Sequence, residues 1–261
     1  MWLPLGKAWF SHRPDRIVNA VTEYDVANLP ILTRPLLTFD QPLKVMAPQL
    51  RIFVPPHPLI QHWLGVARDA DTPDPLFRSA MEELGRWLAY EATREWLPTM
   101  ETTVNTPLGP APATFVNPDV PTLVIPILRA GLALMPGIQA LVPLASVYHM
   151  GFVRNETTLE ASCYLNKLPD QLDPRTRVII SEPMLATGGT IMAMMAELTQ
   201  RGIDPAAVRI ISIVTSPPAL QKLAATYPSV TIFAAAIDEV VNDNGFIVPG
   251  LGDAGDRTFG T

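Results

Sequence analysis

The residues best suited to chemistry follow a short apolar run in the second half of the chain. Val178–Ile180 has the β-branched composition of a strand buried on both faces of a parallel sheet, and this pattern ends at Ser181 and Glu182. A small loop rich in threonine and glycine, Ala186–Thr190, comes next, and apolar residues then recur at helical spacing. Polar groups that follow such a strand lie at the sheet edge where open α/β folds bind ligands.

The loop suits the phosphate group of a sugar phosphate. Glycines allow a ligand to approach the backbone, while loop N–H groups, threonine hydroxyls and the positive helix end favour a dianion. Glu182 can accept hydrogen bonds from vicinal ribose hydroxyls. The loop has no lysine, so it is not the nucleoside-triphosphate loop, and no G-x-G-x-x-G motif occurs here. From the residues alone, an ordinary strand-to-helix turn explains the pattern equally well, because Gly-Gly pairs are common in turns.

The same stretch resembles the phosphoribosyl-diphosphate signature of type I phosphoribosyltransferases. Met184-Leu185-Ala186-Thr187-Gly188-Gly189 has the form typical of the uracil branch of that family. The family usually has aspartate at the position of Glu182, so we expect the ribose contact to persist with a shifted geometry. The substrate-binding residues that the resemblance implies here are Glu182, Met184, Ala186, Thr187, Gly188, Gly189 and Thr190.

Two arginines are candidates for binding the diphosphate of the donor. Arg129 follows the predicted buried strand Leu123–Ile127, although a surface arginine is the simpler interpretation from composition alone. The resemblance instead identifies Ile127–Gly131 as the loop that binds the pyrophosphate. It also identifies Gly151–Leu168 as a flexible hood, in which Arg154 is positioned to close over the diphosphate.

The end of the chain has many glycines and little regular pattern, so its residues alone suggest a frayed terminus. Ile247–Asp256 nevertheless resembles the uracil-binding segment of the family. The resemblance implies that backbone groups at Ile247 and Gly252 recognise the base and that Asp253 faces the donor. Phe246 stands where the family commonly has tyrosine, so one hydroxyl near the base is missing.

The resemblance implies a uracil phosphoribosyltransferase that converts uracil and 5-phosphoribosyl 1-diphosphate to UMP and diphosphate. The expected fold is the α/β type I phosphoribosyltransferase fold, in which helices flank a central parallel sheet and a flexible hood and a C-terminal base-binding segment complete the site. Further strand patterns at 208–214 and 230–234, with a helix between them, agree with a parallel sheet. Arg129, Arg154 and Asp253 are the expected catalytic residues.

Mg²⁺ is the expected cofactor, held by donor oxygens and water with no dedicated protein ligands. Two alternatives remain open. One is a phosphoribosyltransferase for another base, and the other is a non-catalytic sensor of UMP or the donor with the same fold.

Composition limits the other possibilities. The 261 residues are 48% apolar, enough for one large core, and a net charge of -6 argues against a nucleic-acid partner. The single cysteine, Cys163, fits a reducing cytosol, and no apolar run approaches the ~20 residues that span a bilayer. We therefore expect a cytoplasmic protein without a membrane partner, and family habit suggests a homo-oligomer. Residues 1–45 are predicted to be a poorly structured extension, and residues 46–261 the catalytic domain.

Overall fold

The computed structural model describes residues 49–154 and 161–261, apart from the side chain of Arg154. The predicted extension at residues 1–45 and the tip of the predicted hood therefore lie outside the described residues. In the part that is described, no helix is both long enough and apolar enough to cross a membrane.

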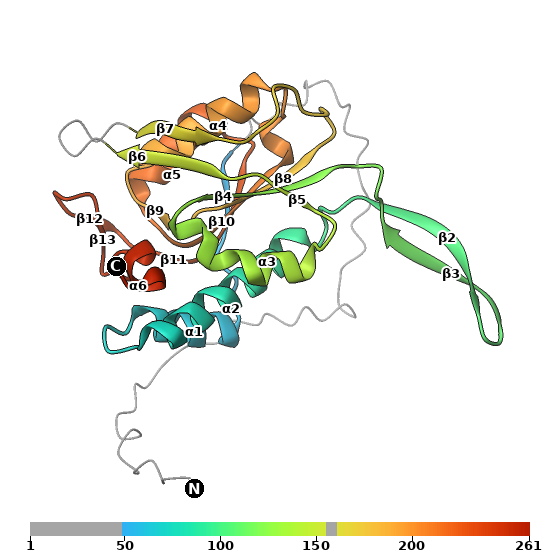
Figure 1. Ribbon diagram of the computed structural model, residues 1–261, viewed down its shortest axis with the longest axis horizontal. Helices are drawn as coiled ribbons and strands as arrows, with labels where there is room; N and C mark the ends of the chain where they lie inside the picture. Colours follow the sequence, from blue (N-terminus) through green and yellow to red (C-terminus); the bar gives the residue numbers. More distant parts are fainter. Residues whose placement is uncertain (1–48, 155–160) are drawn as a thin grey trace, which may run out of the picture. The chain divides into compact units, whose positions relative to one another are not determined.

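A mostly parallel sheet forms the centre of the fold (Figure 1). Every neighbouring pair along its path is parallel except β6 and β7, which form an antiparallel hairpin. In spatial order its strands are β1 (Arg51–Phe53), β11 (Thr231–Ile237), β10 (Val208–Thr215), β8 (Arg177–Ser181), β4 (Thr122–Leu128), β6 (Met150–Arg154) and β7 (Ala161–Asn166). Two short strands join this path, β5 (Ser146–Val147) beside β4 and β9 (Met184–Leu185) beside β10. The predicted parallel α/β sheet is confirmed.

Helices cover both faces of the sheet because its strands are apolar on both faces. Ile179 and Ile211 belong to a core shared with α1 (Pro58–Arg68) and α2 (Asp74–Thr93). Their chain neighbours Ile180 and Ile210 belong to a second core shared with α4 (Gly189–Gln200) and α5 (Pro217–Thr226). Figure 1 shows these two helical layers on opposite sides of the strands. This alternation is what a strand buried on both faces requires.

Two antiparallel pairs lie outside the central sheet. β2 (Thr99–Thr106) and β3 (Gly109–Val116) form a hairpin that projects from the rest of the fold in Figure 1. β12 (Val240–Val241) and β13 (Ile247–Val248) form a short pair near the end of the chain. Helix α6 (Ala254–Phe259) follows. The end of the chain, here called the tail (residues 242–261), is therefore folded, and the frayed terminus suggested by its composition is wrong.

Shorter helices complete the fold. A 3-10 turn, η2 (Ala130–Leu134), leads from β4 directly into α3 (Met135–Leu141), and a second, η3 (Pro205–Ala207), precedes β10. The α1 helix begins after His57, whose Nδ1 accepts a hydrogen bond from the backbone N–H of Leu59 at 3.1 Å. This histidine is therefore a helix cap.

Candidate active site

One cleft of about 670 Å³ brings together segments that are far apart in the sequence. Its lining includes the residues that follow β4, the two strands of the β6–β7 hairpin, the segment after β8, and the tail. A cleft of this volume is within the range of small-molecule sites. The predicted site residues that line it are Arg129, Glu182, Met184, Ala186, Thr190, Phe246, Ile247, Gly252 and Asp253. Thr187, Gly188 and Gly189 line a smaller hollow that adjoins it and shares Glu182 and Thr190.

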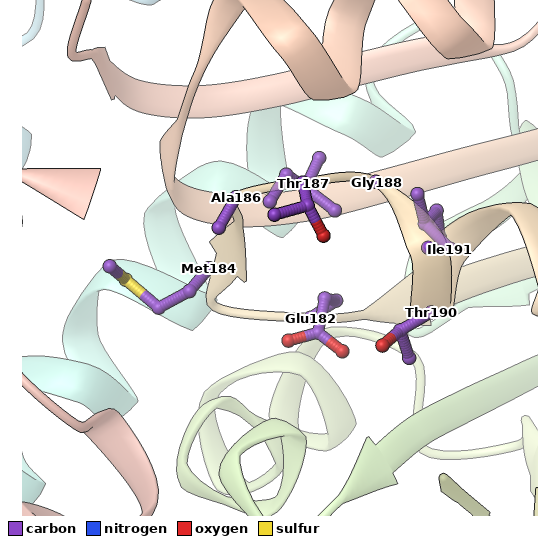
Figure 2. A pocket seen from close by; sticks show the side chains of 9 residues that line it. Glu182, Met184, Ala186, Thr187, Gly188, Thr190 and Ile191 are labelled. Atoms are coloured by element: carbon purple, nitrogen blue, oxygen red, sulfur yellow. The ribbon is translucent and has the colours of Figure 1, made fainter. Parts of the chain in front are cut away.

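The loop before α4, here called the phosphate loop (residues 186–190), presents backbone N–H groups at a helix end. Gly188 is the N-cap of α4, and no side chain caps this end of the helix. The first N–H groups of an α-helix have no partner within the helix, so they remain available to an anion. Figure 2 shows the hydroxyl of Thr187 on the side of the loop that faces Glu182, and both residues line the hollow.

The carbonyl groups of the same loop are bonded on its opposite side. The Ser216 hydroxyl donates to the carbonyl of Ala186, and Lys222 Nζ donates to the carbonyl of Thr187 at 2.8 Å. The backbone N–H of Ser216 also donates to the carbonyl of Leu185 at 3.0 Å. With its acceptors bonded to Ser216, just before α5, and to Lys222, within α5, the loop is held in a fixed orientation.

Gly188 has a backbone conformation and a close neighbour that both favour glycine. Its φ is 80°, a left-handed value that side chains other than glycine adopt at a cost. A Cβ atom here would lie 3.0 Å from the Cα atom of Ala219 in α5, closer than van der Waals contact. The structure shows that Gly188 permits close packing of the loop on α5. The expected close approach of a ligand to this glycine stays a prediction.

The segment that carries Arg129 is fixed against the end of β8. The hydroxyl of Ser181 donates to the carbonyl of Gly131 at 2.8 Å. A Cβ atom at Gly131 would overlap the carbonyl oxygen of Ser181, so only glycine fits this crossing. The close approach brings the end of β4 next to Glu182, which follows Ser181.

Arg129 itself points toward α6. Its Nη2 donates to Asp256 Oδ1 at 2.8 Å, and its Nη1 lies 3.3 Å from the hydroxyl of Thr261. The guanidinium also lies 6.0 Å from the ring centroid of Phe259. Because the side chains of Arg129 and Asp256 are both about half exposed, this pair is weak and can exchange for another anion.

Asp253 serves as a helix cap in this arrangement. Its Oδ1 accepts a hydrogen bond from the backbone N–H of Asp256 at 2.9 Å, which fixes the start of α6. Asp253 also lines the cleft. It is therefore positioned at the site, while the carboxylate that pairs with Arg129 belongs to Asp256.

The tail is held in place by a charged pair from distant parts of the chain. Arg68, at the end of α1, donates from both terminal nitrogens to the carboxylate of Asp238, with both distances 2.8 Å. The backbone N–H of Gly250 donates to Asp238 at 2.9 Å, and the carbonyl of Gly250 accepts from Arg68 at 3.0 Å. The guanidinium of Arg68, with help from this N–H group, lowers the pKa of Asp238 below its ordinary value. The bidentate pair fixes the bend that precedes Gly252.

A second arginine ties α6 to the same helix. Arg257 donates to the carbonyls of Ala67 and Asp69 at the end of α1, and to the carbonyl of Leu251 in the tail. Its guanidinium lies 4.1 Å from the ring centroid of Phe77. A cation at the last carbonyls of a helix is favourable, since these groups lack partners within the helix.

Comparison with known proteins identifies the family to which this arrangement belongs. A family model described as uracil phosphoribosyltransferase matches residues 54–261, which include every lining segment of the cleft. The chain belongs to the uracil phosphoribosyltransferase family. It is 69% identical over 216 residues to a uracil phosphoribosyltransferase from Nostoc sp., covering 83% of this chain and 100% of the relative.

A second relative carries the same family name, and one solved structure is similar in sequence and fold. A uracil phosphoribosyltransferase from Nicotiana tabacum is 52% identical over 213 residues, covering 82% of this chain and 95% of the relative. The structure titled AQ2163 protein from Aquifex aeolicus has a TM-score of 0.72 and 37% identity, covering 80% of this chain and 97% of that one. The type I phosphoribosyltransferase fold expected from the sequence is confirmed.

Several site residues escaped the sequence analysis. The family motifs indicated Arg129 and Asp253 but gave no sign that Asp256 would pair with Arg129. Nor did any local pattern indicate Lys222, which supports the phosphate loop from the middle of α5. The predicted catalytic role of Arg154 stays a prediction, because its side chain lies outside the described residues.

Proposed function

We propose that the protein is a pyrimidine salvage enzyme that transfers the phosphoribosyl group of 5-phosphoribosyl 1-diphosphate to uracil. The bond between ribose C1 and the diphosphate oxygen breaks, uracil N1 bonds to C1 and loses its proton, and UMP and diphosphate are released. The observation that supports this proposal best is a single cleft lined by the phosphate loop, the Arg129 segment and the tail. All three lie within the match to the uracil phosphoribosyltransferase family.

The phosphate loop would hold the 5-phosphate of the donor. The uncapped end of α4 and the hydroxyl of Thr187 offer donors on the side of the loop that faces the hollow. Glu182 lines both the hollow and the larger cleft, which supports a place for its carboxylate between a phosphate in the loop and a base near the tail. This position suits acceptance of hydrogen bonds from the ribose hydroxyls.

Arg129 would stabilise the departing diphosphate. Departure of this group leaves positive charge at C1 and negative charge on the diphosphate, so cations placed near the leaving group lower the barrier. Arg129 is held at the cleft by a half-exposed pair with Asp256, from which a diphosphate can displace it. Arg154 would add a second cation from the β6–β7 hairpin, and closure of that hairpin would exclude water.

Mg²⁺ is the proposed cofactor. In the part of the chain that the structure describes, no group of three or more His, Cys, Asp and Glu side chains could hold a metal ion. Glu182 and Asp253 line the cleft and carry the oxygen donors that Mg²⁺ prefers, so these residues fit an ion that arrives with the diphosphate. When bound, Mg²⁺ neutralises part of the diphosphate charge.

Uracil would bind against the tail through backbone groups of Ile247 and Gly252, both of which line the cleft. A backbone N–H directed at O4 of uracil would meet the amino group of cytosine instead, and a carbonyl directed at N3–H would meet a bare nitrogen. Sites that match hydrogen bonds reject a mismatched analogue by up to ~10⁴ to 10⁵, because buried polar groups are left unpaired.

The deciding experiment compares kcat/KM for uracil, 5-fluorouracil and cytosine with the same donor. We expect 5-fluorouracil to remain a substrate, because fluorine at C5 leaves the hydrogen-bonding edge unchanged, and cytosine to be rejected. Equal values for cytosine and uracil would contradict the role of Ile247 and Gly252. Binding of UMP without any turnover would support the sensor alternative.

We further propose that the enzyme is a homo-oligomer that acts in the cytoplasm. Several apolar side chains on the projecting β2–β3 hairpin are exposed, among them Met100, Leu108 and Phe115, which supports contact with another subunit. Light scattering after size exclusion would measure the assembly.

A further inference from the structure

Three arginines gather at the edge of the sheet opposite the cleft. Arg51, Arg177 and Arg209 stand at or near the amino ends of β1, β8 and β10, which are parallel. Arg51 and Arg209 are both register partners of Thr231 in β11, so their side chains leave the sheet on the same face, on either side of it. Trp96 lies against the group, with Arg209 and Arg177 at 5.3 and 5.8 Å from its ring centroid.

None of these three arginines has an acidic partner among the described residues. The Nε atoms of Arg177 and Arg209 are buried without a hydrogen-bond partner, and so is the hydroxyl of Thr231, a residue that is 1% exposed. Arg175, only two residues before Arg177, is instead paired with Asp173 at 2.7 Å. The three arginines therefore form a group rich in donors and poor in acceptors.

The positive charges at this edge of the sheet repel one another. Burial, followed by the charges of Arg51 and Arg177, lowers the pKa of the Arg209 guanidinium to about 10, which still leaves Arg209 charged at neutral pH. The ring of Trp96 offsets part of this repulsion through its electron-rich face. It does not supply the hydrogen-bond acceptors that the buried Nε atoms lack.

The missing component is an anion with several acceptor oxygens. A guanidinium presents planar N–H donors that match the oxygens of phosphate, and arginine is the usual residue for this contact. Trp96 is only 8% exposed, so a stacked base has no access to its ring and the phosphate group alone accounts for the chemistry.

We propose that Arg51, Arg177 and Arg209 form a second phosphate-binding site at the amino edge of the sheet. It is distinct from the phosphate loop. The two sites lie toward opposite ends of β10. Arg209 and Thr215, near those ends, are six residues apart, which corresponds to about 20 Å at ~3.3 Å per residue. Occupation of the site binds the starts of β1, β8 and β10 to one ion and stabilises that edge of the sheet.

Thermal unfolding of the full-length protein tests the proposal, with inorganic phosphate as the probe and sodium chloride at equal ionic strength as the reference. Phosphate at about ten times its dissociation constant should raise the Tm of the parent protein by roughly 3 to 6 °C over chloride. Arg209→Gln should lose part of this increment and keep only the part that phosphate bound in the phosphate loop supplies. Arg175→Gln is the matched control and should keep it, because Arg175 belongs to the same segment but is already paired.

The comparison between variants separates the new site from the active site, because the phosphate loop is intact in all of them. In chloride alone, Arg209→Gln should melt at or above the Tm of the parent, since it removes a partly buried charge next to two like charges. Arg51→Gln, at an exposed position, is a second variant whose folding is not in question, and it should lose part of the increment. The proposal is wrong if both variants keep the full phosphate increment, or if chloride stabilises the parent as much as phosphate.

Discussion

The phosphate loop and the tail line the same cleft but are held in place by different means. The loop rests on the segment that begins α5, some 30 residues away, through bonds to its own backbone carbonyls. The tail is held by Arg68 and Arg257, which join it to the end of α1 across separations of 170 to 190 residues. One region is therefore fixed within neighbouring βα units, and the other is fixed by long-range side-chain contacts.

Because of this difference, the phosphate loop and the tail should tolerate different substitutions. The loop depends on residue size and backbone conformation at a few positions, because its packing on Ala219 leaves no room for a side chain at Gly188. The tail depends on charged groups whose partners lie on another element. A substitution at Gly188 should therefore affect the donor, and a substitution at Arg68 should affect uracil.

The largest effect is expected from Gly188→Val. A β-branched residue at φ 80° is strained, and its Cβ would also overlap α5, so the phosphate loop must move. We expect the affinity for 5-phosphoribosyl diphosphate to fall by at least ~100-fold, because close positioning of the loop donors is lost. Titration calorimetry with the donor measures this change.

Gly202→Val is the control for backbone strain alone. Gly202 has a φ of 86°, but a Cβ there would meet nothing within 4 Å. This variant should lose stability and keep its affinity for the donor. Equal loss of affinity in the two variants would mean that general destabilisation, and not displacement of the loop, explains the result at Gly188.

Arg68→Gln should have the next largest effect, and on the other substrate. It leaves the carboxylate of Asp238, which is 8% exposed, without its cation, and it removes the bond to the carbonyl of Gly250. Arg68 is itself partly exposed, so we expect a loss of about 2 kcal/mol, below the range for fully buried pairs. The KM for uracil should rise by ~10-fold or more, with little change in donor affinity.

Arg86→Gln provides the matched comparison. Arg86 pairs with Glu82 and Glu83 on the surface of α2, where such pairs contribute little. The KM for uracil and the affinity for the donor should both stay near the parent values. If Arg68→Gln instead weakened donor binding as much as uracil binding, the tail and the phosphate loop would not be independent regions.

The sequence was informative about the phosphate loop because its elements are local. The apolar run at 178–180, the small residues at 186–190 and the helical spacing beyond them occur in one continuous stretch, and the structure has a strand, a turn and a helix in that order. Periodicity also indicated which strands are buried on both faces. The packing of Gly188 on α5 was not predictable in this way, since it depends on a residue outside the stretch.

The support of the tail was not predictable by the same reasoning. Asp238 appears in the sequence only as the end of an apolar strand, and Arg68 only as the last residue of a helix. Periodicity shows which face of an element is buried, but it does not show which polar side chain on another element meets it. The family resemblance supplied the identity of the base-binding segment without supplying the contacts that hold it.

A smaller effect is expected from Lys222→Met. The substitution removes one hydrogen bond to the carbonyl of Thr187 and keeps the helix propensity of α5. Ser216 still holds the neighbouring carbonyl, so the phosphate loop should stay in place with more freedom. We expect donor affinity to fall by roughly 2- to 5-fold, as for the loss of one hydrogen bond. Lys222→Arg, which retains a charged donor, should be close to the parent, and an unchanged affinity in the methionine variant would show that Ser216 is sufficient.

The smallest effect is expected from removal of residues 1–45, which should leave kcat/KM within about 2-fold and Tm within about 2 °C of the parent, a change of less than ~1 kcal/mol. The Nostoc relative is matched over its whole length by 216 residues of this chain, and the family model begins only at residue 54.

A longer deletion, of residues 1–56, is the informative comparison because it also removes β1. That strand pairs with β11, and Phe53 stacks on Phe233 with ring centroids 5.1 Å apart. Since β11 ends beside Asp238, loss of its edge partner should raise the KM for uracil before it weakens donor binding. The measurements are Tm, the KM for uracil and the affinity for the donor. A large loss of Tm in the shorter deletion would show that residues 1–45 contribute to the stability of the folded protein. An equal loss of both affinities in the longer deletion would contradict the independence of the tail and the phosphate loop.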